Sequence, residues 1–259
     1  MEWFTQASEL VPCECSHVPG EVDQLVSAVR SSKRPSDIVL TGSVTEAKLG
    51  FDFTRIPDTE VVFEHSDYSV AVNVSPLSRG HLLFLPHRSE LRPQVLNATE
   101  LSLFLRVFQR LNVGTLGGFN SLGAGASVNH LHFHLLPPGS VDFNCPLAGV
   151  HFRKYSANQV EDIMCTVSDL QEANIPHNLI FFRRGQVESE VCVLPRSFAS
   201  TQPTHDRLAA FLEFGGTVVV PQPIGTEELH DYCDEVRSLS LEFPTDPVQP
   251  KCARPRQNS

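Results

Sequence analysis

Residues 120–137 read NSLGAGASVNHLHFHLLP and carry the most specific pattern in the 259-residue sequence. Polar and apolar residues alternate from His130 to Leu135, which is the period of a β-strand with one face in the core, and the expected strand covers residues 127–136. In such a strand His130, His132 and His134 share one face, with each successive pair roughly 6.5–7 Å apart. The pattern therefore predicts a strand with a core face and a face that carries three imidazoles.

Three interpretations of this row of imidazoles are open. The histidines can be structural, although strict alternation beside an apolar row is an unusual choice for a structural surface. They can bind zinc, but such a site needs another ligand or an open water position, and the nearby cysteines are not spaced as metal ligands. One imidazole can also be a nucleophile toward phosphorus, with its neighbours fixing its tautomer and holding phosphate oxygens. The third interpretation is favoured.

The loop at residues 121–126, SLGAGA, has the composition of a phosphate-binding turn. Gly123 and Gly125 would let backbone N–H groups approach a phosphate. The loop lacks the lysine and the following helix of a P-loop, so a plain tight turn explains it equally well. Nearby polar side chains can donate to phosphate or ribose, or can be ordinary turn groups: Asn120, Ser127 and Asn129.

Short β-rich runs around this stretch predict an α+β fold with an antiparallel sheet and flanking helices. The expected strands of the N-terminal part are residues 51–56, 60–65, 69–74, 81–86, 112–120 and 127–137. Apolar residues at helical spacing predict helices over residues 21–30 and from a cap at Asn97 to Leu111.

The C-terminal part repeats this pattern more faintly. Its expected strands are residues 148–154, 178–183, 190–196 and 217–221, and its expected helices are residues 157–172 and 226–240. We therefore expect one continuous body with two related halves. Residues 1–140 form the half with the histidines, residues 141–243 form a second half that completes the site, and residues 244–259 form a flexible tail.

The composition excludes several classes of protein. The sequence has 20 Lys and Arg against 30 Asp and Glu, for a formal net charge of −10, which argues against nucleic acid and anionic membranes as partners. The first basic residue is Arg30, so the N-terminus resembles neither a secretory signal nor a transit peptide, and we expect a cytoplasmic protein. No carboxylate cluster suits Mg²⁺, and we expect no metal.

The histidine pattern also matches a known signature. Residues 130–136 read H-φ-H-φ-H-φ-φ, where φ is apolar, and this resembles the histidine-triad (HIT) superfamily. The closer resemblance is to the GDP-hexose phosphorylases, namely the animal GDP-D-glucose phosphorylases and the plant GDP-L-galactose phosphorylases. It is carried by residues 51–55 (FDFTR), 72–86 (VNVSPLSRGHLLFLP), 118–134 (GFNSLGAGASVNHLHFH) and 175–179 (IPHNL), followed by Arg184 and Gly185.

This resemblance implies a HIT-like antiparallel sheet with flanking helices, in which two related halves form a pseudo-dimer. It implies that His132 attacks the α-phosphorus of a GDP-sugar, flanked by His130 and His134. A guanylyl-histidine forms and hexose 1-phosphate leaves, after which inorganic phosphate releases GDP. Sugar 1-phosphate and inorganic phosphate are both stable anions, so no strong acid is required, catalysis rests on positioning and charge stabilisation, and we expect no cofactor.

Two further residues are candidates for the nucleotide and phosphate site. Arg55 can pair with a phosphate through two N–H groups, or it can be an ordinary surface arginine. His177 can enter the pocket from the second half, or it can merely cap a strand. The alternatives for the function are a HIT-type nucleotide hydrolase, in which water resolves the intermediate, and a non-catalytic nucleotide-binding or interaction protein.

Overall fold

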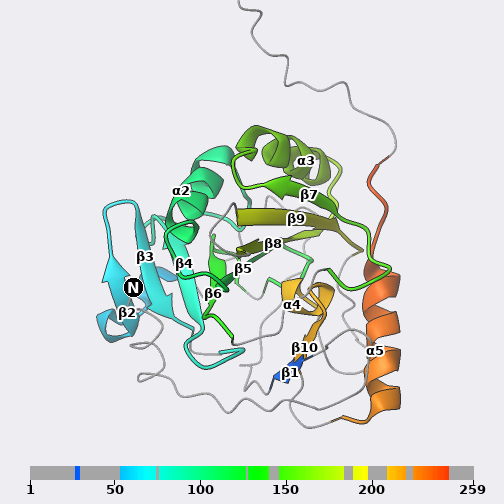
Figure 1. Ribbon diagram of the computed structural model, residues 1–259. Coiled ribbons are helices and arrows are strands. Elements are labelled where there is room, and N and C mark those ends of the chain that lie inside the picture. Colours follow the sequence, from blue (N-terminus) through cyan, green and yellow to red (C-terminus); the bar gives the residue numbers. More distant parts are fainter. Residues whose placement is uncertain are drawn as a thin grey trace, which may run out of the picture.

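The computed structural model describes residues 27–29, 53–73, 76–126, 128–139, 146–183, 189–197, 209–219 and 224–244. These residues contain an antiparallel sheet with the strand order β2-β3-β4-β6-β5-β8-β9-β7. Helices α2 and α3 pack on one face of the sheet, and α4 and α5 pack on the other (Figure 1). The predicted α+β fold, an antiparallel sheet with flanking helices, is confirmed.

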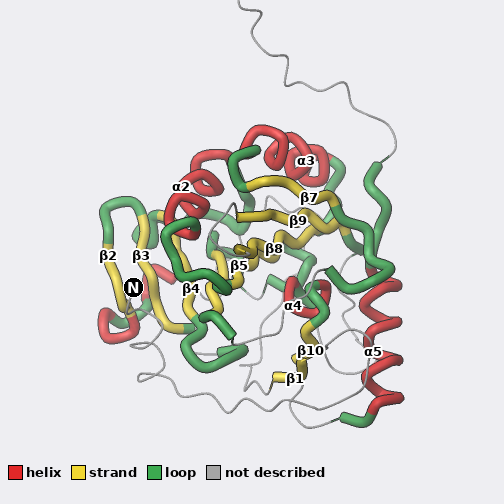
Figure 2. The backbone as a smooth tube through the Cα atoms, viewed as in Figure 1, coloured by secondary structure: helices red, strands yellow, loops and turns green. Residues whose placement is uncertain are grey.

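The strands of the sheet are short, and Figure 2 shows how loops connect them. They are β2 Val61–Glu64, β3 Tyr68–Val72, β4 Leu82–Pro86, β5 Leu116–Asn120, β6 Phe133–Leu136, β7 Arg153–Ser156, β8 His177–Arg183 and β9 Ser189–Pro195. The helices are α2 Ala98–Phe108, α3 Val160–Glu172, α4 Phe211–Phe214 and α5 Thr226–Leu239, with 3-10 turns η1 Phe53–Arg55 and η2 Asp58–Glu60. No helix in these described ranges is long and apolar enough to cross a membrane.

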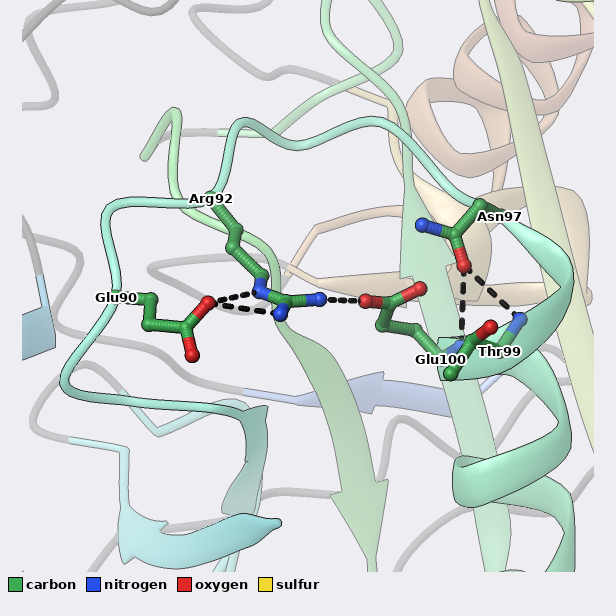
Figure 3. Close-up of polar contacts among 5 residues, drawn as sticks. All are labelled: Glu90, Arg92, Asn97, Thr99 and Glu100. Carbon is green, nitrogen blue, oxygen red and sulfur yellow. Dashed lines mark hydrogen bonds and ion pairs between the residues drawn. The ribbon is translucent and has the colours of Figure 1, made fainter.

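Helix α2 begins where its cap predicts. The side-chain oxygen of Asn97 accepts hydrogen bonds from the backbone N–H groups of Thr99, at 2.9 Å, and Glu100, at 3.3 Å (Figure 3). This satisfies two of the N–H groups that the first turn of a helix leaves without partners. The apolar stripe of the helix, which includes Phe104 and Phe108, is buried against the sheet.

An aromatic core lies between α2 and the sheet. The rings of Phe104 and Phe133 stack with centroids 4.2 Å apart, and Phe181 meets Phe104 edge-on at 4.8 Å. Gly117 on β5 makes room for these rings, since an added Cβ would lie 3.1 Å from the Phe104 side chain. Each buried ring contributes about 1.5–3 kcal/mol, so this core fixes the positions of β5, β6 and β8.

Gly118 performs the same task on the opposite face of β5. An added Cβ there would lie 2.3 Å from the ring of Phe211, the first residue of α4. Phe211 is 1% exposed, so its ring has little space to move. The two glycines therefore let aromatic rings approach both faces of the same strand closely.

Two predicted elements are wrong. Residues 27–29 form strand β1 (Ser27–Val29), which pairs in parallel with β10 (Thr217–Val219), rather than part of a helix over residues 21–30. The spacing of apolar residues over 21–30 is that of a helix, but residues 27–29 pair instead with a strand that is distant in the sequence. Residues 53–55 form a 3-10 turn instead of a strand, because the N–H of Phe53 bonds to a histidine ring rather than to a neighbouring strand.

The sheet runs without a break from one predicted half to the other. The link is the antiparallel pair β5 and β8, in register from Leu116 opposite Phe182 to Asn120 opposite Asn178. The division into halves at residues 1–140 and 141–243, and their relation as a pseudo-dimer, stay predictions. Residues 245–259 of the predicted tail lie outside the described part of the chain.

We predict that Gly118→Ala lowers the free energy of unfolding by about 1–3 kcal/mol, because the new methyl group displaces the Phe211 ring. Thermal or urea unfolding measures this loss. Gly225→Ala is the control, since nothing lies within 4 Å of an added Cβ at Gly225, and it should cost less than about 1 kcal/mol. Equal losses in the two variants would contradict the steric explanation.

Candidate active site

The predicted strand at residues 127–137 is only partly correct. Strand β6 begins at Phe133, so His134 lies in the sheet while His130 and His132 lie in the segment before it. That segment takes its hydrogen bonds from the loop between β4 and α2. The N–H of Leu131 donates to the carbonyl of Arg92 at 2.9 Å, which replaces a bond that a neighbouring strand would otherwise provide.

The three histidines nevertheless meet on one side of the sheet. Phe133 and Leu135 enter the core under α2, so the alternation of β6 turns His134 toward the opposite face. The rings of His132 and His134 have centroids 5.1 Å apart.

Phe53 connects the remaining histidine to this pair. Its ring lies 5.4 Å from that of His130 and 5.1 Å from that of His132. His130 and His132 are 1% and 3% exposed, and His134 is half-buried. Phe53 belongs to a motif that was recognised in the sequence. Its contacts with the two histidine rings could not be predicted from that motif.

Backbone partners fix the protons on two of these rings. Nδ1 of His132 lies 2.7 Å from the carbonyl oxygen of His130. A carbonyl only accepts, so Nδ1 carries the proton and Nε2 carries the lone pair. In His130 the assignment is reversed, because Nδ1 accepts the N–H of Phe53 at 3.0 Å. Burial lowers the pKa of His132 from 6.5 to about 4, which keeps its ring neutral at pH 7.

A fourth histidine fixes the tautomer of His134. The N–H of Leu77 donates to Nδ1 of His81 at 2.9 Å, so the proton of His81 is on Nε2. This Nε2–H donates to Nδ1 of His134 at 3.0 Å, which places the proton of His134 on Nε2. Sequence reasoning did not select His81, although the Gly80-His81 pair that leads into β4 was part of the recognised motif.

The amide nitrogen of Asn120 faces the ring of His134. Its Oδ1 accepts from Nδ2 of Asn178 at 2.7 Å and from the N–H of Phe211 at 3.0 Å. Its Nδ2 therefore faces Nε2 of His134, at 3.5 Å. This contact is a hydrogen bond only when Nε2 of His134 is unprotonated; in the tautomer that His81 sets, Nε2 is protonated and two N–H donors lie side by side. Such a pair suits an anionic oxygen.

The glycine loop, residues 121–126, is a tight turn that contacts Asn178 on β8 and Ala210 before α4. Gly123 and Gly125 have positive φ angles of 76° and 92°, which other residues rarely adopt. Nδ2 of Asn178 donates to the carbonyl of Ala124 at 2.8 Å. An added Cβ at Gly125 would lie 3.0 Å from Cβ of Ala210. The loop thus follows Asn120 directly, and these contacts fix its position next to that residue.

The other predicted binding residues lie in different surroundings. Oδ1 of Asn129 accepts the N–H of Gln94 at 3.0 Å, so this side chain anchors a loop. Arg55 is exposed at the end of η1, and Ser127 lies outside the described residues. Among the described residues, no group of three or more His, Cys, Asp or Glu side chains is arranged to hold a metal ion.

The structure does not bring the ring of His177 to the triad. His177 begins β8, and the alternation of that strand turns its ring away from Asn120 and toward Phe119, 6.2 Å away, on the side of α2 and α3. Its Nδ1 bonds to the carbonyl of Ile175 at 3.0 Å. Burial lowers its pKa from 6.5 to about 4. The role of His177 in the nucleotide and phosphate site stays a prediction.

Comparison with known families agrees with the recognised motifs. Residues 12–136 match the family model "GDPGP1-like, N-terminal domain". The resemblance predicted from the sequence is thereby confirmed. The matched residues include all three histidines of the triad and the glycine loop before them.

Similar proteins with known activities come from plants and animals. GDP-L-galactose phosphorylase 2 of Arabidopsis thaliana is 27% identical over 75% of this chain and 56% of its own length. GDP-D-glucose phosphorylase 1 is 37% identical in Danio rerio, over 39% of this chain and 31% of that protein. In Homo sapiens it is 36% identical, over 43% and 29%. The chain thus spans about half the length, or less, of these relatives.

Among solved structures, the fold is similar to that of yeast Ap4A phosphorylase Apa2. The complex of that enzyme with Ap4A has a TM-score of 0.54 and 21% sequence identity, over 73% of this chain and 79% of that chain. The same enzyme in another crystal structure has a TM-score of 0.52. These similarities show a shared fold.

We predict that His132 and His177 make stability depend on pH. The pKa of each falls from 6.5 to about 4 on folding, so between these values the unfolded chain binds more protons than the folded protein. Stability is therefore highest above about pH 6.5 and decreases toward about pH 4, by up to about 3 kcal/mol per histidine. Urea unfolding across this range measures the slope.

Replacing either ring should flatten that slope. His132→Asn and His177→Asn each remove one buried imidazole, and each variant should lose less stability on acidification than the wild type. A slope unchanged in both variants would show that other groups control the acid sensitivity.

Proposed function

We propose that this protein is a GDP-hexose phosphorylase, which converts GDP-D-glucose and inorganic phosphate to GDP and glucose 1-phosphate. The observation that carries the proposal is the 2.7 Å contact between Nδ1 of His132 and the carbonyl of His130, which leaves the lone pair on Nε2 of a neutral ring. The names of the similar plant and animal enzymes, GDP-L-galactose and GDP-D-glucose phosphorylase, support this substrate class.

In the first step Nε2 of His132 attacks the α-phosphorus of the GDP-hexose. The new N–P bond forms as the bond from the α-phosphorus to the bridging oxygen breaks, and hexose 1-phosphate leaves. The guanylylated ring keeps its proton on Nδ1 and so gains a positive charge. The carbonyl of His130, 2.7 Å from Nδ1, stabilises that charge.

The charge on the phosphate oxygens is met by N–H donors. Nδ2 of Asn120 is an N–H donor, and so is Nε2 of His134 in the tautomer that His81 sets; the two nitrogens are 3.5 Å apart. An α-phosphate oxygen bound beside both nitrogens would accept from both. Because His81 and Asn178 hold these donors in place before substrate arrives, little reorganisation is needed during the reaction.

In the second step inorganic phosphate attacks the same phosphorus, the N–P bond breaks and GDP leaves. This completes a guanylyl transfer, so we propose a nucleotidyltransferase. Hexose 1-phosphate leaves as a stable anion in the first step, and the neutral imidazole of His132 leaves in the second, so neither step needs a strong acid, and we propose no metal or other cofactor. The net charge of −10 offers no broad attraction for nucleic acid or anionic membranes. We propose small phosphorylated molecules as its partners and the cytoplasm as its location.

We further propose that residues 141–243 complete this site. Two residues of that segment support this role. Asn178 orients the amide of Asn120, and the ring of Phe211 stacks on that of His134 with centroids 5.2 Å apart. The binding roles of Gly123, Gly125, Ser127, Asn129 and Arg55 stay predictions.

The proposal is tested by incubating the purified protein with GDP-glucose and radiolabelled phosphate. Phosphorolysis transfers the label into the β-phosphate of GDP. Exclusive production of GMP would instead identify a hydrolase. A protein that binds GDP-glucose and releases no product would be a binding protein. Parallel assays with GDP-mannose, GDP-galactose and UDP-glucose determine the preferred base and hexose.

His132→Asn should abolish product formation, because the amide cannot act as the nucleophile, while GDP binding changes by less than about tenfold. His151→Asn is the matched control, since His151 is an exposed histidine outside the triad, and its activity should equal that of the wild type. Turnover that survives in His132→Asn would refute the covalent mechanism.

A further inference from the structure

Gln94 is a buried side chain that forms hydrogen bonds with the backbone of His132. It is 1% exposed and lies in the loop between β4 and α2. Its Oε1 accepts the N–H of His132 at 2.8 Å, and its Nε2 donates to the carbonyl of the same residue at 3.1 Å. Nε2 also donates to the carbonyl of Asn120 at 2.8 Å. One amide thus satisfies both backbone groups of His132.

This arrangement takes the place of a missing strand partner. The ladders of β6 with β4 and β5 begin at Phe133 and His134, so His132 lies just beyond both. A side-chain amide has the same donor and acceptor as a peptide group. Gln94 therefore continues the hydrogen-bonding pattern of the sheet by one residue, at the position of the proposed nucleophile.

The loop that carries Gln94 is itself anchored. The guanidinium of Arg92 bonds to Glu90 at 2.7 and 2.9 Å and to the fully buried carboxylate of Glu100 on α2 (Figure 3). On the other side, Nε2 of Gln171 on α3 donates to the carbonyl of Leu96 at 3.1 Å. A loop fixed to two helices can hold an amide in one position.

We infer that Gln94 is a positioning residue for His132. The bond from Nδ1 of His132 to the carbonyl of His130 joins two residues that are only two positions apart. This hydrogen bond forms only while the backbone from His130 to His132 keeps one conformation. Gln94 fixes that conformation because it binds both the N–H and the carbonyl of His132. This inference rests on the proposed function only for the role of His132 as nucleophile. The effect of Gln94 on the ring of His132 does not depend on it.

A purely structural glutamine would behave differently. It would satisfy buried backbone groups, and its loss would lower stability without changing the proton or the orientation of the His132 ring. The two roles are therefore separated by a measurement on that ring rather than by a measurement of stability.

The test uses Gln94→Met, which keeps the length of the side chain and removes its hydrogen bonds. Gln171→Met is the matched control, because it makes the same chemical change at an anchor of the same loop that does not touch His132. Nitrogen-15 NMR of histidine-labelled protein reports which ring nitrogen of His132 is protonated. Steady-state kinetics with GDP-glucose and phosphate report kcat and KM.

We expect the wild type and Gln171→Met to hold His132 as a single tautomer with the proton on Nδ1. In Gln94→Met we expect a mixture of tautomers. We also expect kcat to fall by about 100-fold, the effect of a displacement of about 1 Å, while KM changes by less than about threefold. A single Nδ1–H tautomer and wild-type kcat in Gln94→Met, at whatever stability, would overturn the inference.

If Gln94→Met does not fold, Gln94→Asn serves the same test, because its amide is one methylene too short to reach both backbone groups of His132. A single Nδ1–H tautomer and wild-type kcat in Gln94→Asn would also overturn the inference. If the wild type shows no phosphorolysis, the proposed function fails, but the tautomer comparison still decides whether Gln94 positions the ring.

Discussion

The hydrogen bond from Nδ1 of His132 to the carbonyl of His130, 2.7 Å long, is the interaction on which the chemistry of this site depends. It determines which ring nitrogen carries the lone pair, and it can stabilise the charge that the ring would gain on guanylylation. Burial adds a second constraint, because it lowers the pKa of His132 to about 4 and keeps the ring unprotonated. A neutral imidazole with a fixed tautomer is the state that a nucleophile requires.

The direction of His134 is set from the other face of the sheet. Phe133 stacks on Phe104 with centroids 4.2 Å apart, and Phe133 stands between His132 and His134 in the chain. Because neighbouring side chains of a strand point to opposite faces, fixing Phe133 in the core fixes the direction of His134. Gly117 admits these rings without strain. The aromatic core is thus part of the support of the site as well as a source of stability.

Local patterns in the sequence predict the antiparallel sheet, the cap of α2 and the face on which His134 lies, because each depends on residues near one another in the chain. Other features depend on distant partners. The prediction of a strand that includes His130 and His132 is wrong, because the sequence does not reveal that the backbone of His132 bonds to Gln94, 38 positions away. Likewise, Phe53 lies in a 3-10 turn and not in the predicted strand, because its N–H bonds to His130, 77 positions away.

The same long-range dependence explains why the three histidines alone do not make the site. Nδ2 of Asn120 faces His134 only because its Oδ1 is held by Asn178 and by the N–H of Phe211, which are 58 and 91 positions away. Without those two donors, the amide of Asn120 could rotate and present an oxygen to the phosphate, and the site would repel the charge it is proposed to bind. The family match over residues 12–136 contains the histidines and Asn120 but neither of these donors. The chemistry of the triad is therefore coupled to the packing of β8 and α4 against β5.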